Sequence, residues 1–108
     1  NVMQAVDGPV LIDWDLLCAA PPGWDHGPLL RWASRWGERP GEYEAFAAGY
    51  GRSLAEDPRT IAFAELRLVA ATLMRVGATT RSPEAWGEAE RRLRYWRVDP
   101  DAPPWSAQ

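Results

Sequence analysis

The first apolar positions of the chain fall into two short runs on either side of Asp7-Gly8. This pattern predicts a β-hairpin, because glycine accepts the positive φ that a tight connection between two strands needs. Pro9 has no N–H to donate, so the second strand is expected to start at or after it and to end with residues 10–12. Asp13 then follows at the open end of the hairpin.

Beyond residue 23 the apolar positions recur with a helical period and predict about four helices. We expect the first helix to begin between residues 24 and 28 and to reach about 36, and the second to span about 42–55. The third should start after the capping acid Asp57 and end near a Gly77 cap. The fourth should start at Ser82 and run through 96. The third is apolar on nearly all sides, so it is expected to be the most buried element, with Leu66, Val69 and Leu73 covered.

Composition and charge narrow the picture further. The 108 residues are 46% hydrophobic, which is enough for a core and argues against disorder. Every basic residue is an arginine and these alternate with acids, so no basic stripe for nucleic acid is expected. The chain has no apolar run of about 20 residues that would span a membrane. It opens without a methionine, which we interpret as the start of a fragment. Cys18 is the single cysteine and is predicted to be a small buried side chain in a reducing cytoplasm.

The open end of the predicted hairpin carries the one constellation with candidate chemistry. A hairpin brings its two ends together, so Asn1 and Asp13 would offer two hard oxygen ligands of the kind that suit magnesium. The alternative is that Asp13 caps a strand end and that Asn1 is a frayed terminus. His26 has no serine or cysteine nucleophile motif near it and is expected to be a surface or hydrogen-bonded residue. The tryptophans fall mostly on apolar helix stripes, which favours core packing. The tail after Asp99 contains three prolines around Trp105 and is predicted to lie extended on the surface.

Several short motifs follow one another along the chain, and their order and spacing carry a resemblance to a known family. Asn1, then Val10-Leu11-Ile12-Asp13-Trp14-Asp15, then Trp24-Asp25 resembles the aminoglycoside phosphotransferase family, which is choline-kinase-like and has a protein-kinase-like fold. The Tyr50-Gly51 pair, the 65–68 segment Glu-Leu-Arg-Leu and the closing Pro104-Trp105 resemble bacterial members. The resemblance implies a mainly α chain, the C-terminal helical part of a kinase-like fold beginning at the catalytic-loop Asn. Residues 1–15 would be a metal-bearing hairpin and 16–108 a helical subdomain of the C-lobe, together one domain or fragment.

The resemblance also implies roles for single residues. Asn1 matches the catalytic-loop Asn, and Asp13 matches the Asp of the kinase Asp-Phe-Gly motif, so both would hold Mg2+ together with ATP or GTP. Asp25 would be a structural acid that ties the start of a helix to the catalytic region. The catalytic base, the phosphate-clamping Lys and the phosphate loop belong upstream of Asn1, so the chain carries no catalytic base and its missing N-terminal part is an expected partner.

Relatives in that family line the acceptor pocket with acids from the helical part. Candidates here are Asp15, Glu42, Glu44 and Glu65. The implied function is transfer of the γ-phosphate of ATP or GTP to a hydroxyl of an aminoglycoside-like or other small substrate in the cytoplasm. The alternative is a non-enzymatic helical domain that keeps the kinase-lobe fold for packing or for binding a partner. Neither nucleic acid nor a membrane is an expected partner.

Overall fold

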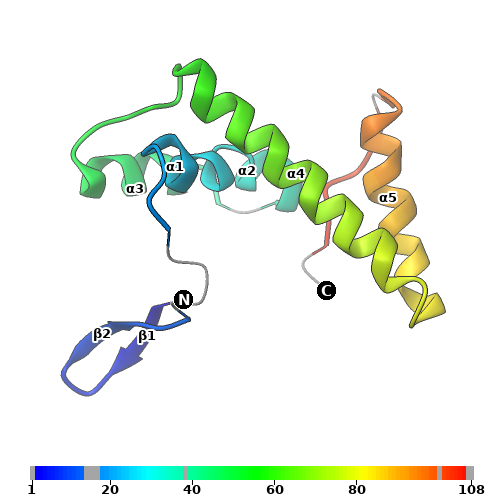
Figure 1. Ribbon diagram of the computed structural model, residues 1–108, viewed down its shortest axis with the longest axis horizontal. Coiled ribbons are helices and arrows are strands. Elements are labelled where there is room, and N and C mark those ends of the chain that lie inside the picture. The colour runs from blue at the N-terminus through cyan, green and yellow to red at the C-terminus, as the bar shows by residue number, and fades with distance from the viewer. Residues whose placement is uncertain (1, 14–17, 38, 100, 107–108) are drawn as a thin grey trace.

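A computed structural model describes residues 2–13, 18–37, 39–99 and 101–106, without the side chain of Trp32. An N-terminal hairpin is followed by helices that lie against one another, and the longest of them, α4, crosses the whole assembly (Figure 1). The predicted fold class, mainly α with an N-terminal β-hairpin, is therefore confirmed. Among the helices described, none combines the length and the apolar character needed to cross a membrane.

The hairpin consists of β1 (Val2–Ala5) and β2 (Gly8–Leu11) in antiparallel pairing. Val2 pairs with Leu11 at the open end and Ala5 with Gly8 at the turn. Gly8 has a φ of 119°, a conformation that a residue with a Cβ rarely adopts. Figure 1 shows the hairpin standing away from the helices, and most of its side chains are exposed.

The first predicted helix is divided into α1 (Gly23–Leu30) and α2 (Trp32–Trp36). Arg31 separates them with φ −109° and ψ −2°, and its N–H bonds the carbonyl of Pro28 at 3.4 Å. Pro28 lies inside α1 and has no N–H, so the ordinary helical ladder is interrupted just before this point. A single continuous helix was therefore the wrong expectation.

α1 packs its backbone directly on α4 (Pro58–Ala78). A Cβ added to Gly27 would lie 2.9 Å from the amide nitrogen of Ala64, and one added to Gly23 would lie 2.5 Å from Oγ1 of Thr60. Only glycine allows this close approach. The two helices are consequently held at a separation that any larger residue at these positions would increase.

After α2 in the chain comes α3 (Glu42–Tyr50), which packs against α1 and is capped by Gly51 in the left-handed conformation, with φ 89°. This helix is shorter than the predicted span to residue 55, because a glycine cap stops it first. Asp57 caps α4 as expected, since its carboxylate accepts a 2.8 Å hydrogen bond from the N–H of Arg59. Gly77 lies inside α4 and does not cap it. The helix ends at Ala78 and its C-cap is Thr79, whose hydroxyl donates to the carbonyl of Val76 at 2.7 Å.

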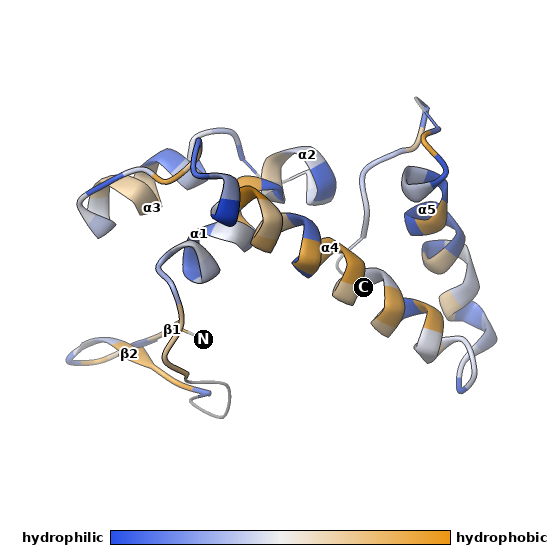
Figure 2. Ribbon diagram, turned by 45° about the horizontal axis from the view of Figure 1, so that its top comes forward, coloured by the Kyte–Doolittle hydropathy of each residue, from blue (hydrophilic) through white to orange (hydrophobic). Residues whose placement is uncertain are grey.

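Burial along α4 is confined to one face. Its buried residues are spaced four apart and are Thr60, Ala64, Leu68 and Thr72. The prediction of all-round burial was wrong, because the exposed fraction is 52% for Leu66, 38% for Val69 and 65% for Leu73. The described helices cover the face that carries Leu68 and three short side chains, which allow close packing, and leave Leu66, Val69 and Leu73 outside. Figure 2 shows hydrophobic colour along much of α4.

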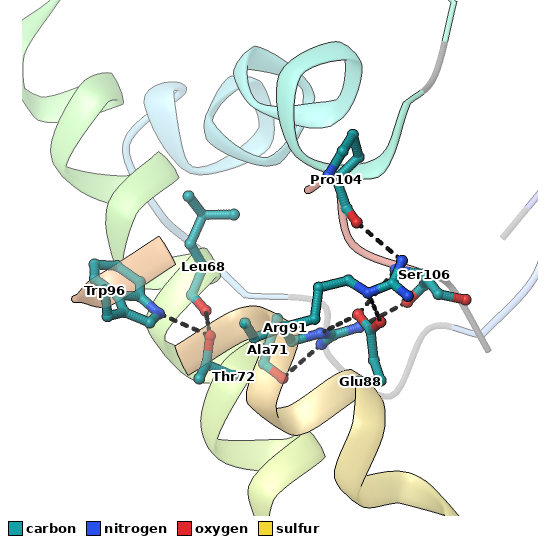
Figure 3. Close-up of polar contacts among 9 residues, drawn as sticks. Leu68, Ala71, Thr72, Glu88, Arg91, Trp96, Pro104 and Ser106 are labelled. Carbon is teal, nitrogen blue, oxygen red and sulfur yellow. Dashed lines mark hydrogen bonds and ion pairs between the residues drawn. The ribbon is translucent and has the colours of Figure 1, made fainter. Parts of the chain in front are cut away.

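The C-terminal part is held by a polar cluster. A 3-10 turn, η2 (Pro83–Ala85), leads into α5 (Trp86–Trp96), as the Ser82-Pro83 start signal predicts. The guanidinium of Arg92 donates to Glu88 Oε1 and to the Ser106 carbonyl, both at 2.8 Å. Glu88 Oε1 also accepts the Ser106 N–H at 2.8 Å. Figure 3 shows Glu88 and Ser106 facing each other across this contact.

Two further expectations about exposure were wrong. Trp105 is 3% exposed, although the tail does run without helix or strand. Its ring makes edge contacts with Trp36 and Tyr95, and its main-chain N–H donates a hydrogen bond to the Arg35 carbonyl, so the tail is anchored instead of lying loosely on the surface. Cys18 is exposed because it belongs to the proline-rich segment before α1, outside the helix packing.

Candidate functional site

The open end of the hairpin places Asp13 two residues beyond the pair formed by Val2 and Leu11. Asp13 has a φ of 63°, which is the left-handed region, and it is exposed. Aspartate is among the few residues other than glycine that enter this region, and such residues concentrate at functional sites. Its carboxylate has no hydrogen bond or ion pair with any other described residue.

The chemistry of this position suits a hard cation. An exposed carboxylate without a protein partner keeps its oxygens available, and Mg2+ prefers such oxygens in a shell that retains several waters. Asn1, the second predicted ligand, lies outside the described residues, and so does the acceptor candidate Asp15. Within the described ranges, no group of three or more His, Cys, Asp or Glu side chains is placed to hold a metal ion.

The remaining acceptor candidates occupy three different environments. Glu44 lies in the first turn of α3 and lines an open pocket of about 430 Å³, together with Tyr43, Ala47, Ala48, Gly51, Arg52, Ser53 and Ala55. Glu42 lies in the same turn and is half-buried, but it is not part of that lining. Glu65 of α4 pairs with Arg31 at 2.6 Å. The structure therefore does not bring these acids together in one pocket.

The ion pair with Arg31 reduces the negative charge that Glu65 presents to a substrate. Both side chains are more than one-third exposed, so the pair contributes at most about 1 kcal/mol to stability. Its effect on the site is larger, because the guanidinium already offsets the charge that a cationic acceptor would need. Sequence reasoning missed this pair, since the two residues are 34 positions apart and neither has a pattern that points to the other.

Asp25 lies in the first turn of α1, where an acid interacts favourably with the helix dipole. It is exposed, and its carboxylate has no partner within the part of the chain that the structure describes. The neighbouring His26 is fully buried instead. Its Nδ1 lies 3.1 Å from the Tyr43 hydroxyl, which also accepts the Leu54 N–H at 2.9 Å. His26 therefore links α1 to α3 and to the loop before α4, in agreement with the prediction of a hydrogen-bonded residue.

Comparison with known proteins bears on the same part of the chain. The sequence model of the phosphotransferase enzyme family matches residues 1–68, which contain the hairpin, α1, α2, α3 and the first half of α4. Asp13, Asp25 and the glutamates at 42, 44 and 65 all fall inside the match. No curated protein and no solved structure matches the chain.

Proposed function

The chain belongs to the phosphotransferase enzyme family, and on that premise we propose that it forms part of a small-molecule kinase. The kinase would transfer the γ-phosphate of ATP or GTP to a hydroxyl group of an aminoglycoside-like or other small substrate. The observation that carries this proposal is the exposed carboxylate of Asp13, which has no partner among the described residues and is held in a left-handed backbone conformation at the open end of the hairpin.

In the proposed site Asp13 and Asn1 hold Mg2+. Bound there, Mg2+ would supply positive charge that offsets the charge of the nucleotide phosphates. Asn1 directly precedes β1, whose first residue pairs with the last residue of β2, and this supports placing its amide near Asp13. The hairpin contributes rigidity, because two paired strands fix the direction in which the chain leaves toward Asp13. A residue upstream of Asn1 would accept the proton of the acceptor hydroxyl, so the chain acts together with that N-terminal part.

For the acceptor, Glu44 is the leading candidate among the glutamates. It lines an open pocket and has no ion-pair partner among the described residues, whereas Glu65 is paired with Arg31. The charge of an unpaired carboxylate at a pocket attracts a cationic substrate, although Arg52 lines the same pocket and offsets part of that charge. The separation of the acidic candidates is the observation that favours the alternative, a non-enzymatic domain that uses this fold for packing or partner binding. An Asp in a His-Gly-Asp sequence just upstream of Asn1 supports the kinase, and its absence supports the alternative.

The test replaces Asp13 with Asn in the protein that includes the upstream residues. We expect phosphate transfer from γ-labelled ATP, at saturating Mg2+, to fall by about 100-fold or more, the scale of losing one group that stabilises transition-state charge. Thermal unfolding should change little, since Asp13 is exposed and pairs with none of the residues that the structure describes. Asp7→Asn is the matched control: it makes the same change of charge in the turn of the same hairpin. An Asp13→Asn rate close to that of Asp7→Asn would contradict the proposal.

A further inference from the structure

The open pocket beside α3 is lined by one acidic and one basic side chain. Glu44 lies in the first turn of α3, and Arg52 directly follows the glycine cap Gly51 at the other end of this helix. Neither charged group has a hydrogen bond or an ion pair with any residue that the structure describes, so the two do not pair with each other. A ligand in this pocket therefore meets charges of both signs, and not the uniformly negative surface that suits a polycation.

Glu65, the acceptor candidate on α4, is likewise accompanied by an arginine. Its carboxylate accepts a 2.6 Å hydrogen bond from Arg31, which lies at the break between α1 and α2. Glu44 and Glu65 are therefore each matched by one positive charge, the first by sharing a pocket and the second by direct pairing. An acceptor with several ammonium groups would find no excess of negative charge at either residue.

Hydrogen bonds fix one wall of this pocket. The Tyr43 hydroxyl accepts the N–H of Leu54 at 2.9 Å and lies 3.3 Å from Oγ of Ser53, and Ser53 Oγ also accepts the N–H of Ala55 at 3.3 Å. The segment 53–55 is thus tied to α3, and Tyr43, Ser53 and Ala55 all line the pocket. Its volume of about 430 Å³ suits a small molecule, and a wall that is already in place lowers the entropy cost of binding.

The length of α3 separates the two charged residues. Glu44 lies near the start of the helix and Arg52 just beyond its end. Because a helix rises about 1.5 Å per residue, their backbones lie about 10 Å apart along the helix axis. A ligand that contacts both side chains therefore has its own opposite charges several atoms apart.

From this arrangement we infer that the pocket binds a small zwitterion, with its ammonium group toward Glu44 and its carboxylate toward Arg52. The inference rests on the proposed kinase function in one respect: it makes such a zwitterion, carrying a hydroxyl group, the acceptor of the phosphate. It narrows the acceptor to a compound whose charges are balanced. Binding of the zwitterion itself requires neither Asp13 nor ATP.

The experiment is isothermal titration of the protein that includes the upstream residues, without ATP and at low ionic strength. The probe is ε-aminocaproate, which has its two charges at the ends of an alkyl chain. Hexylamine and caproate each carry one of these charges, and spermidine is the polycation. We expect saturable binding of ε-aminocaproate that is about fivefold tighter than that of either singly charged compound, the scale of one exposed charge contact, and that weakens as salt is added. No binding of ε-aminocaproate, or tighter binding of spermidine, would overturn the inference.

Single variants separate the two contacts. Glu44→Gln should remove the preference for ε-aminocaproate over caproate, because the ammonium group loses its partner, and Arg52→Gln should remove the preference over hexylamine. Glu42→Gln and Arg81→Gln are the matched controls, since Glu42 lies in the same turn as Glu44 and Arg81 is exposed, but neither lines the pocket. Both controls should keep the Kd of the wild type. Equal effects in a variant and its matched control would also count against the zwitterion.

The titration is separable from the test of the proposed function. If Asp13→Asn lowers phosphate transfer as expected while ε-aminocaproate does not bind, the kinase proposal stands and the zwitterion inference fails. If ε-aminocaproate binds with the expected dependence on Glu44 and Arg52 but the protein transfers no phosphate, the pocket is a zwitterion site and the kinase proposal fails.

Discussion

The guanidinium of Arg92 in α5 donates a 2.8 Å hydrogen bond to the main-chain carbonyl of Ala71 in α4. The same group bonds Glu88 and the carbonyl of Ser106, and it lies 5.1 Å from the centre of the Trp105 ring. One side chain therefore joins two helices and the C-terminal tail. Arg92 is 6% exposed, so its charge is buried and depends on these partners.

Replacing Arg92 with Met is expected to lower the free energy of unfolding by about 3 kcal/mol, because it leaves the buried carboxylate of Glu88 without its main partner. Urea denaturation measures the loss. Arg91→Met is the control on the same helix: Arg91 also contacts Glu88, at 3.4 Å, but its side chain is 43% exposed. This variant should lose less than about 1 kcal/mol. Equal losses in the two variants would show that Arg92 does not hold α4, α5 and the C-terminal tail together.

A pair of leucines on α4 tests the one-sided burial of this helix. Leu68 is 1% exposed and Leu73 is 65% exposed. Leu68→Ala should cost about 2–5 kcal/mol, because it removes buried methyl groups and leaves a cavity. Leu73→Ala should change stability by less than about 0.5 kcal/mol, as expected of a surface position. A large loss in Leu73→Ala, measured by the same urea titration, would mean that another part of the protein covers this face.

The leucine pair also shows where sequence reasoning succeeds and where it fails. The hairpin turn and the Asp57 cap depend on residues within a few positions of one another, and both were predicted correctly. The buried face of α4 depends on which helices lie against it. That face contains the short side chains of Thr60, Ala64 and Thr72, which a hydrophobicity pattern does not single out. Hydropathy therefore assigned Leu66 and Leu73 to the core, while close packing selected the smaller residues.

In the candidate site, too, some features have a signal in the sequence and others appear only in the structure. The order of motifs along the chain suggested Asp13 as a metal ligand; the family match covers that position, and the role of Asp13 stays a prediction. Its left-handed backbone has no sequence signal of its own. The Arg31–Glu65 pair and the convergence of Gly23 with Thr60 join residues more than 30 positions apart. Contacts of this kind arise from the approach of α1 to α4, and one sequence without its structure does not reveal them.

The hydroxyl of Tyr43 gives a third prediction. It accepts the Leu54 N–H at 2.9 Å and lies 3.1 Å from Nδ1 of the buried His26. Tyr43→Phe should lower the free energy of unfolding by about 1–3 kcal/mol, because two polar groups lose their partner. Tyr50→Phe is the control, since the Tyr50 ring also contacts His26 but its hydroxyl has no hydrogen bond with any other described residue. Equal stability of the two variants in urea would contradict this role of the Tyr43 hydroxyl.

The charge of Asp57 predicts a dependence of stability on pH. Hydrogen bonds from the Arg59 side chain and N–H lower the pKa of Asp57 below its usual value of 3.8. A lowered pKa in the folded state stabilises the fold above the unfolded pKa, and this contribution is lost as pH falls through the folded pKa. Asn also caps helices well but has no charge. Asp57→Asn should therefore melt below the wild type at pH 7, and the difference should shrink as the pH falls below 3.8 and through the lowered folded-state pKa of Asp57.

Thermal unfolding at several pH values measures this difference. Asp7→Asn, an exposed acid in the hairpin turn with no ion pair among the described residues, is the reference for a change of net charge alone. A constant gap between wild type and Asp57→Asn from pH 7 to pH 3 would mean that the carboxylate acts only as a cap and that its charge contributes nothing.

The last prediction follows from the proposed kinase function and concerns the 108-residue chain by itself. Phosphate transfer needs several groups placed at once, to position the nucleotide and to stabilise charge. In the proposal this chain supplies only the two metal ligands, Asn1 and Asp13. Two oxygen ligands bind Mg2+ weakly, because the ion releases its waters reluctantly and relies on substrate phosphates for much of its shell. We therefore expect millimolar affinity for Mg2+ and ATP at best, which corresponds to roughly −4 kcal/mol.

Isothermal titration of the chain with ATP in excess Mg2+ measures this affinity, and release of labelled phosphate measures turnover. Asp13→Asn should reduce the weak binding further, whereas Asp7→Asn should leave it unchanged, because only Asp13 lies at the open end of the hairpin. Micromolar binding that does not depend on Asp13, or Mg2+-dependent turnover by the chain alone, would place the active site elsewhere in these 108 residues.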